Sequence, residues 1–437
     1  MNSHRKQLVA LAHPVYLGLL ASVAAGIINT VWVSRLGGPA VAAVAVATNT
    51  ENVLLGVALV FASGTTVLVA HARGARDPDG VRAAVRGGVA LWALVTPVVA
   101  VGGFLLREPL ARLVLDGGRA VSLATAYFAI SMPGIAVFFA QQLVDGILKG
   151  SGDTRTPMRL ALLANGLILV CDPFLIHVYG VQGAAASTVL CRALTLGVGL
   201  LALRRNTLLR SCPGVPSGVS LRATLTTGLP MAADFTVRQG GALVLVAIVA
   251  RLGVTAVAAY SIAYKVMYVA TMAFYAVRQA ASIHTAHLRG AGRDARRVIG
   301  REAVVVSGAV GLVAAVLLFV TAPWIMAAFG AGPEVAHDGV AFLRCVGPYL
   351  LLMACFIALG GVFEGSGQAK VLLRVTLLGA AVQPALAYGC TGLGLPGVSL
   401  AMALAMALQC GVVTVLFRRT RAGVQEEAEA SWAGASA

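Results

Sequence analysis

Charged side chains are scarce in this chain of 437 residues, where they make up 11% of the sequence and include only four lysines. Hydrophobic residues make up 59%. A soluble domain carries about 25% charged residues, so this composition excludes an ordinary soluble protein. Basic residues outnumber acidic ones by 33 to 17, which gives a net charge of +16.

Motifs for catalysis and metal binding are also missing from the sequence. The seven cysteines show no metal-ligand spacing, and six of them fall within or beside apolar runs, as buried small hydrophobic residues do. There is no paired-aspartate metal motif, no metal-spaced His/Cys cluster and no serine elbow. We therefore expect a protein that is not an enzyme and that holds neither a metal nor another cofactor.

Long apolar runs dominate the chain. Each is long enough to cross the hydrocarbon core of a bilayer, which is roughly 30 Å thick. Backbone groups in lipid need partners within the chain, and these runs are too long for barrel strands, so we interpret them as helices. The sequence predicts an all-α integral membrane protein with 12 transmembrane helices, at residues 12–34, 40–70, 87–106, 120–147, 157–178, 181–203, 224–250, 255–283, 303–327, 340–363, 371–391 and 396–417.

The sequence of the first half returns in the second. The matching segments are residues 35–43 with 251–259, residues 70–75 with 286–291, and residues 146–152 with 361–367. The first two pairs have the same offset in numbering (251 − 35 = 286 − 70), and the offset of the third (361 − 146) is smaller by one. An offset of half the chain indicates one duplicated unit. We expect two pseudo-symmetric six-helix lobes, an N-lobe at 1–205 and a C-lobe at 223–420, joined by a cytoplasmic linker at 206–222.

Basic residues gather in one set of short loops between the spans, which places those loops and both termini in the cytoplasm. Six crossings per half bring each half back to its starting side, so the repeats are parallel. The same placement argues against a nucleic-acid partner, because the basic residues lie in the short loops between the spans, as membrane topology requires. The tail at 421–437 is acidic, then small and polar, and we expect it to be disordered.

Several motifs resemble the multidrug and toxic compound extrusion (MATE) family of secondary antiporters, and specifically its DinF-type branch. They are Arg35-Leu36-Gly37, Gly146-x-x-x-Gly150-x-Gly152, Asp172-Pro173, Gly228-Leu229-Pro230, and Asp234-x-x-x-Arg238. The resemblance covers the chain to about residue 420. It implies a V-shaped pair of lobes, alternating access, and export of organic, often cationic, compounds coupled to entry of H⁺ or Na⁺. We expect a monomer in the bacterial inner (plasma) membrane, whose partners are small-molecule substrates and the lipid bilayer.

Asp172, in the fifth predicted span, is the first candidate for cation coupling. An ionisable side chain within a span indicates function, and a carboxylate in apolar surroundings can exchange a proton near neutral pH. The alternative is a helix N-cap before Pro173. The family's motif matches Asp172 to a coupling aspartate and Thr188 to a hydroxyl in the same cavity, although Thr188 could equally serve helix packing. The motif also has an aspartate where this chain has Asn29, which cannot titrate.

Glu51 is the obvious replacement for that missing carboxylate. Lys265 lies close to the repeat position of Glu51, and we hypothesise that the two form an ion pair in one access state; a static pair is the alternative. Asp234 and Arg238 are four residues apart and share a helix face, where they could bind a proton, orient substrate or simply pair. Together with Asp172, these are the charged candidates in the predicted spans.

A row of aromatic residues follows one face of the eighth predicted span. Tyr260, Tyr264 and Tyr268 recur every four residues. Such a wall could stack on flat cationic compounds, or could serve ordinary interhelical packing. Two other carriers remain alternatives: a flippase for a lipid-linked substrate, which would need more cationic residues, and the major facilitator superfamily, whose basic loop motif is missing from residues 71–86. A single carboxylate in the N-lobe favours H⁺ over Na⁺.

Overall fold

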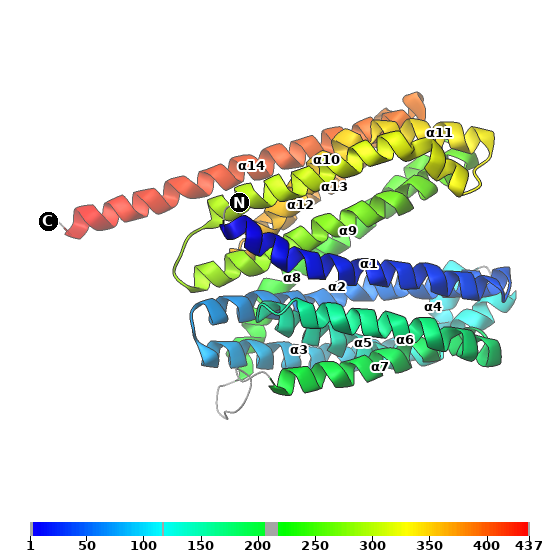
Figure 1. Ribbon diagram of the computed structural model, residues 1–437, viewed down its shortest axis with the longest axis horizontal. Coiled ribbons are helices and arrows are strands. Elements are labelled where there is room, and N and C mark those ends of the chain that lie inside the picture. Colours follow the sequence, from blue (N-terminus) through cyan, green and yellow to red (C-terminus); the bar gives the residue numbers. More distant parts are fainter. Residues whose placement is uncertain (1–2, 116–117, 206–216, 436–437) are drawn as a thin grey trace. The chain divides into compact units, whose positions relative to one another are not determined.

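Helices make up the whole regular structure of the described chain. The computed structural model describes residues 3–115, 118–205 and 217–435, which contain helices and no strand (Figure 1). Before residue 206 the helices are α1 (Ser3–Ser34), α2 (Gly38–Gly74), α3 (Pro78–Leu105), α4 (Arg107–Val114), α5 (Gly118–Gly150), α6 (Arg155–Tyr179) and α7 (Val181–Arg205). After residue 216 they are α8 (Ser217–Ala250), α9 (Val254–Gly290), α10 (Arg296–Ala328), α11 (Pro333–Cys345), α12 (Gly347–Gly365), α13 (Ala369–Gly389), a 3-10 turn (Thr391–Leu393) and α14 (Gly394–Ala435).

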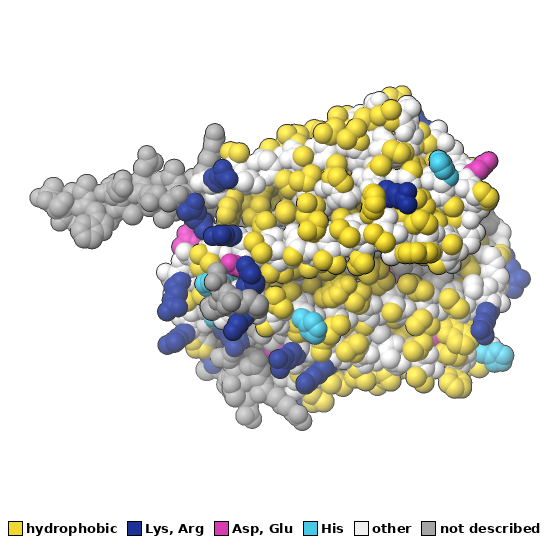
Figure 2. All heavy atoms as spheres, turned by 45° about the horizontal axis from the view of Figure 1, so that its top comes forward, with side chains coloured by type: hydrophobic (Ala, Val, Ile, Leu, Met, Phe, Trp, Pro, Cys, Tyr) yellow, Lys and Arg dark blue, Asp and Glu magenta, His cyan; other side chains and the backbone are white. Residues whose placement is uncertain are grey.

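Twelve of these helices are long and apolar enough to cross a membrane, which confirms the predicted number of spans. Their outward faces carry large apolar side chains: Val98, Phe174, Leu243 and Trp324 are between 68% and 71% exposed. Figure 2 shows hydrophobic side chains covering the flanks of the helices, with arginine and lysine gathered near their ends. Apolar area on this scale, rimmed by charge, fits a lipid environment and not water.

Most helices extend beyond the predicted spans, and one predicted span is divided. The span predicted at 340–363 is divided at Val346, so that the membrane-spanning helix α12 begins at Gly347. Pro348 explains the division, because proline lacks the N–H that a continuous helix would bond to the Arg344 carbonyl and fits the first turn of a new helix. Helix α14 continues as far as Ala435, and the disorder expected for the tail stays a prediction. Alanine and glutamate, both strong helix formers, dominate residues 426–430.

The chain forms two compact units. Unit 1 contains Met1–Thr236, Gln279–Ile299 and Glu364–Ala369, and unit 2 contains Val237–Arg278, Gly300–Phe363 and Lys370–Ala437. In unit 1, α2 packs against α5, α5 against α7, α7 against α6, and α6 against α1. The predicted lobe boundaries stay a prediction. Most of the predicted linker, residues 206–216, lies outside the described residues, and α8 already begins at Ser217.

Glycines of α5 lie directly against α2, where a larger residue would not fit. A Cβ on Gly146 would lie 2.7 Å from the Ala62 carbonyl oxygen, and one on Gly150 would lie 2.6 Å from that of Thr66. The hydroxyl of Thr66 also donates a hydrogen bond to the Gly146 carbonyl at 3.0 Å. Small residues let helix backbones approach closely, and the Gly146-x-x-x-Gly150 motif serves this contact.

The second half of the chain repeats this packing with equivalent residues. A Cβ on Gly361 of α12 would meet the Arg278 carbonyl, and one on Gly365 would meet that of Ser282, both on α9. Arg278 and Ser282 are the repeat counterparts of the two α2 residues that receive the α5 glycines (278 − 62 = 282 − 66 = 251 − 35). The duplication therefore preserves which residues meet, as well as the sequence pattern.

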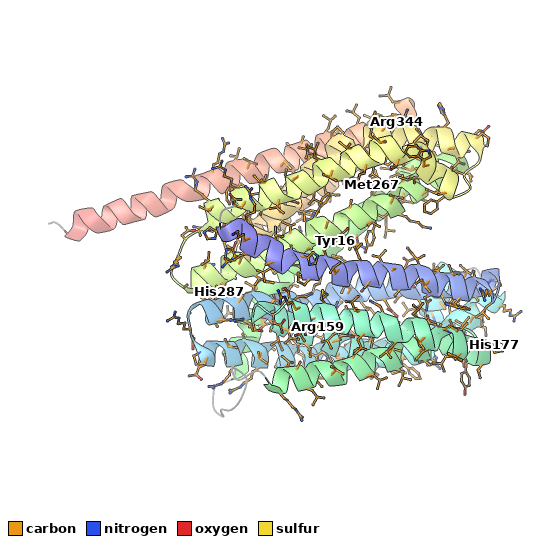
Figure 3. The ribbon with its side chains drawn as sticks, viewed as in Figure 1. Tyr16, Arg159, His177, Met267, His287 and Arg344 are labelled. Atoms are coloured by element: carbon orange, nitrogen blue, oxygen red, sulfur yellow. The ribbon has the colours of Figure 1, made fainter. Side chains whose placement is uncertain are left out.

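The ends of α2 and α9 make a contact with the same symmetry within unit 1. A Cβ on Gly74 would fall on the backbone carbonyl of His287, and a Cβ on Gly290 would fall on that of His71. Gly290 is the repeat counterpart of Gly74, and His287 that of His71, because both pairs have the offset of the internal repeat. Both histidines therefore belong to a structural contact between helix ends. Figure 3 shows His287 near the end of α9.

Left-handed backbone positions also recur between the halves. The repeated pairs are Gly37 (φ 98°) with Gly253 (φ 109°), Gly152 (φ 81°) with Gly367 (φ 77°), and Arg76 (φ 56°) with Gly292 (φ 71°). Arg76 is the one described residue other than glycine with positive φ. It follows α2 as Gly292 follows α9, and its side chain makes the left-handed conformation unfavourable.

Replacing Arg76 with glycine is expected to stabilise the protein by about 1 kcal/mol, because glycine adopts positive φ without a Cβ clash. Thermal unfolding in detergent measures the change. Arg76→Ala is the matched control, since it removes the same charge and keeps the Cβ. An equal gain in both variants would mean that charge, and not backbone conformation, sets the effect.

Candidate functional site

Asp172 lies inside unit 1, on α6, and is 1% exposed. Phe174, two residues later, points outward and is 71% exposed. Helix α6 continues through Pro173 to Tyr179, so Asp172 does not cap a new helix. Proline has no backbone N–H, which removes one helical hydrogen bond beside the carboxylate. The buried face of α6 thus presents this carboxylate to the interior of unit 1.

Asn29, on α1, binds Asp172 directly. Its side-chain nitrogen Nδ2 donates to Oδ2 of Asp172 at 2.8 Å, so the structure brings together two of the predicted residues. The other carboxylate oxygen, Oδ1, and the hydroxyl of Ser187 on α7 are buried, and neither has a hydrogen-bond partner among the described residues. A buried carboxylate with one acceptor engaged and one open is able to take up a proton.

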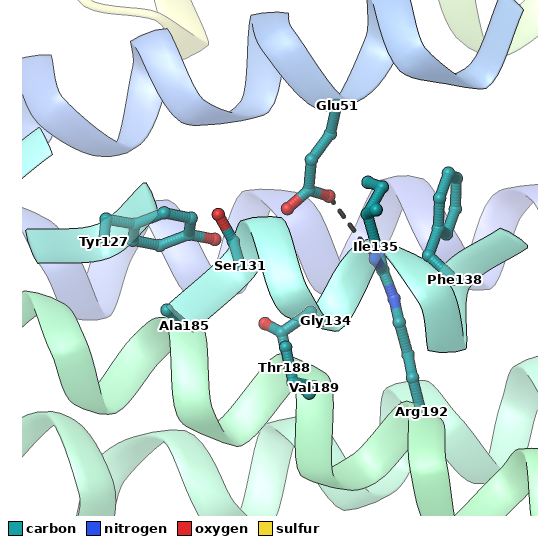
Figure 4. A pocket seen from close by; sticks show the side chains of 10 residues that line it. All are labelled: Glu51, Tyr127, Ser131, Gly134, Ile135, Phe138, Ala185, Thr188, Val189 and Arg192. Carbon is teal, nitrogen blue, oxygen red and sulfur yellow. Dashed lines mark hydrogen bonds and ion pairs between the residues drawn. The ribbon is translucent and has the colours of Figure 1, made fainter. Parts of the chain in front are cut away.

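Glu51 and Arg192 form a second polar cluster in unit 1, between α2 and α7. Nη1 of Arg192 lies 3.4 Å from Oε2 of Glu51, and the guanidinium carbon lies 4.8 Å from the centre of the Phe138 ring. Figure 4 shows the Tyr127 and Ser131 side chains of α5 reaching the space beneath the Glu51 carboxylate. Pairing offsets the cost of two charges within the membrane-spanning helices.

The two clusters are neighbours in unit 1. Tyr127, which lines the Glu51 pocket, is close enough to Asp172 to interact with it electrostatically, as it does with Glu51 and Arg192. Thr188 lines the same pocket, and its hydroxyl donates to the Ala184 carbonyl of its own helix at 3.0 Å. The structure therefore places all four predicted coupling residues around one region of unit 1.

Arg192 is a functional candidate that sequence reasoning did not select. It lies midway along α7 (Val181–Arg205) and not near a helix end. An arginine at the middle of a predicted span was the available signal. The partner that the structure gives Glu51 is Arg192, whereas Lys265 is an exposed residue of α9 in unit 2. The hypothesised pair of Glu51 with Lys265 stays a prediction.

Unit 2 contains a larger pocket, of about 130 Å³, between α8, α9, α12, α13 and α14. All three predicted tyrosines line it, with the Tyr260 and Tyr264 rings stacked at 6.0 Å between centroids. Tyr264 and Tyr268 are 38% and 41% exposed. Sequence reasoning missed the residues that line the pocket from the later helices, because their side chains neither titrate nor form an aromatic row within one span. These residues are Met353, Thr376, Gln383, Met402 and Gln409.

Arg238 lines the same pocket from α8, with its guanidinium carbon 5.1 Å from the centre of the Phe356 ring. Asp234, one turn earlier on α8, is 1% exposed. Their predicted mutual pairing stays a prediction. Met267, labelled in Figure 3, adds a buried thioether from α9 to the tyrosine wall. Aromatic rings, methionines and neutral amides make this pocket adaptable to apolar, flat molecules.

Clusters suited to a metal ion are absent from the described part of the chain, in that no three His, Cys, Asp or Glu residues gather closely enough to hold one. The polar groups instead form two pockets inside helical units of a membrane protein. Internally duplicated bundles with polar sites at mid-membrane define the class of secondary transporters. Within that class, this chain is one of the transporters with twelve spans in two sequence-related halves.

Comparisons with known proteins identify the family. The chain matches the MatE family model over residues 14–174 and 230–389, and it belongs to this family of MATE transporters. It is 25% identical to the probable multidrug resistance protein YpnP of Bacillus subtilis, covering 85% of each chain. It is 26% identical to DNA damage-inducible protein F of Escherichia coli, covering 87% of this chain and 85% of that one.

Solved structures show the same fold. A transporter of the MOP superfamily from Pyrococcus furiosus superposes with a TM-score of 0.90 at 22% identity, covering 97% of both chains. The family match and this likeness confirm the predicted MATE resemblance and the all-α, twelve-span architecture.

Proposed function

We propose that this transporter is an antiporter that exports organic, often cationic, small molecules in exchange for protons by alternating access. The buried carboxylate of Asp172 supports this proposal more than any other feature. Asn29 donates to one of its oxygens and leaves the other open, so proton uptake there would not break the existing hydrogen bond. Sodium prefers several oxygen ligands, and one amide-bound carboxylate offers few, which favours H⁺ over Na⁺.

Glu51, Asn29 and Thr188 complete the proposed coupling site around Asp172. A proton taken up from outside neutralises Asp172, and its release to the cytoplasm restores the charge. Transport is coupled if the protonated and charged forms favour opposite access states, since a ligand shifts an equilibrium only through different affinities for the two states. The cargo and the proton are then coupled because they favour opposite access states.

The pocket of unit 2 is the proposed substrate site. Tyr260, Tyr264 and Tyr268 offer faces for stacking on flat aromatic cargo, and Arg238 supplies charge in the pocket lining. Asp234 and Lys265, on the same two helices, stay predicted substrate-binding residues. The names of the relatives, multidrug resistance proteins among them, support small organic cargo. A flippase for a lipid-linked substrate is the alternative, and the few cationic residues that line the pocket argue against it.

The proposed setting is the inner membrane of a bacterium, with both termini in the cytoplasm and the protein working as a monomer without a cofactor. The bias of lysine and arginine towards one set of loops supports this orientation. We also propose that the protein transports its cargo chemically unchanged.

Transport in proteoliposomes tests the proposal, with a cationic dye as cargo and a pH gradient and a sodium gradient imposed separately. We expect dye movement against its gradient with the pH gradient alone. Movement driven only by sodium would contradict proton coupling. Movement of a fluorescent lipid analogue between leaflets, without dye transport, would favour the flippase alternative.

A further inference from the structure

The Glu51 pocket already contains an organic cation, the guanidinium of Arg192. This flat, delocalised group contacts a carboxylate on one side at 3.4 Å and lies 4.8 Å from the centre of the Phe138 ring on another. A carboxylate and an aromatic ring are the two features that bind planar organic cations in general. The pocket therefore has the chemistry to accept a cargo molecule of the same kind.

The contact between Arg192 and Glu51 is looser than the ion pairs of Arg82 with Asp79 and of Arg296 with Asp294. Its single contact of 3.4 Å exceeds the 2.7 Å of Arg296 with Asp294, and charge-assisted hydrogen bonds are typically about 2.7–2.9 Å. The Arg192 and Glu51 side chains are 26% and 20% exposed, so both reach open space. A pair with this geometry can be exchanged for another cation with little loss.

The pocket is too small to hold both the Arg192 side chain and a cargo molecule. With Arg192 in place, about 10 Å³ is free, which is room for roughly one water molecule. Gly134, Ile135 and Val189, from α5 and α7, also line the pocket. A molecule larger than water can therefore contact both Glu51 and Phe138 only by displacing the arginine.

We propose that Arg192 is a tethered competitor for cationic cargo: it occupies the Glu51 and Phe138 contacts until an organic cation replaces it. A cation restores the charge balance of Glu51 when the arginine leaves, whereas a neutral molecule would leave a carboxylate without its partner in the membrane interior. Arg192 thereby selects for positive charge. This inference rests on the proposed export of organic cations and assigns them a contact site in unit 1.

Binding of tetraphenylphosphonium to the purified protein in lipid nanodiscs tests the proposal, at alkaline pH, which keeps carboxylates ionised. Arg192→Met fills similar space without charge, and Arg192→Gln is a second variant should the first fail to fold. A competitor leaves the site open only in a minor fraction, about 0.1–10%, so its removal should tighten binding at least about tenfold. Arg192→Lys keeps the charge and should bind as the wild type does.

Uncharged triphenylphosphine oxide separates competition by charge from simple opening of space. Tighter binding of the cation but not of the neutral compound, with the gain lost in a Glu51→Gln/Arg192→Met double variant, supports the proposal. An equal gain for both compounds overturns it, as does unchanged or weaker cation binding in Arg192→Met and Arg192→Gln. Dye transport by wild-type proteoliposomes is measured alongside, and its absence would instead contradict the proposed antiport.

Discussion

Replacing Asp172 with asparagine is expected to abolish proton-driven dye transport while leaving the fold intact. Asparagine has the same shape, and its carbonyl oxygen can still accept the 2.8 Å hydrogen bond from Asn29. It cannot take up a proton. A coupling free energy of about 1–3 kcal/mol between two ligands changes the affinity for one of them by about 5–150-fold. The dye affinity of the wild type should therefore change with pH by about 5–150-fold. The Asp172→Asn affinity should not vary with pH.

Two transport assays on this variant distinguish lost coupling from lost protein. Uptake driven by a pH gradient should fall to the level of empty liposomes, whereas exchange of labelled for unlabelled dye without a gradient should persist. Asp79→Asn is the matched control, because Asp79 is 74% exposed and its ion pair with Arg82 contributes at most about 1 kcal/mol. Normal gradient-driven uptake by Asp172→Asn would remove Asp172 from the mechanism.

Introducing alanine at both Gly74 and Gly290 is expected to force apart the ends of α2 and α9. Each new Cβ would fall on a backbone carbonyl, of His287 or His71, which cannot rotate away as a side chain could. Overpacking typically costs about 1–3 kcal/mol per site, and the two sites belong to one contact. The contact should open, and the protein should unfold at lower temperature.

Cysteine labelling reports the opening directly. Ala286 is fully buried beside this contact, so a cysteine placed there in a cysteine-free background should react slowly with a water-soluble maleimide. The Gly74→Ala/Gly290→Ala pair should accelerate this labelling. Gly166→Ala is the matched control, since its Cβ would meet nothing within 4 Å on α6. Equal labelling in all variants would show that the helix ends tolerate the added methyl groups.

Sequence reasoning succeeded where the pattern is local or duplicated. Apolar runs of this length predict helices because backbone groups in lipid must form their hydrogen bonds within the chain. The internal repeat aligned residues 146–152 with 361–367, and Gly146 of α5 and Gly361 of α12 make equivalent contacts. The break before Pro348 was missed because the apolar run continues across it, although proline itself was the signal.

The pockets could not be predicted in the same way. Arg192 and Glu51 are far apart in the sequence, and only the packing of α2 against α5 and α5 against α7 determines that they face each other. The rotation of each helix about its axis decides which candidates share a cavity. Asn29 with Asp172 was within reach only through the resemblance to a family motif. Thr188 was also found through that resemblance, whereas the tyrosines were found because they recur every four residues within one helix.

The contact between the ends of α2 and α9 has the property of an isologous interface, in which residue i contacts residue j and j contacts i. Gly74 meets His287, and Gly290 meets His71, so one contact occurs twice with exchanged partners. A polypeptide half this long could form the same contact as a homodimer. In such an ancestor one mutation would alter both copies together. Fusion into a single chain lets each be tuned separately, and the left-handed Arg76, where the other half has Gly292, shows that the halves have already diverged there.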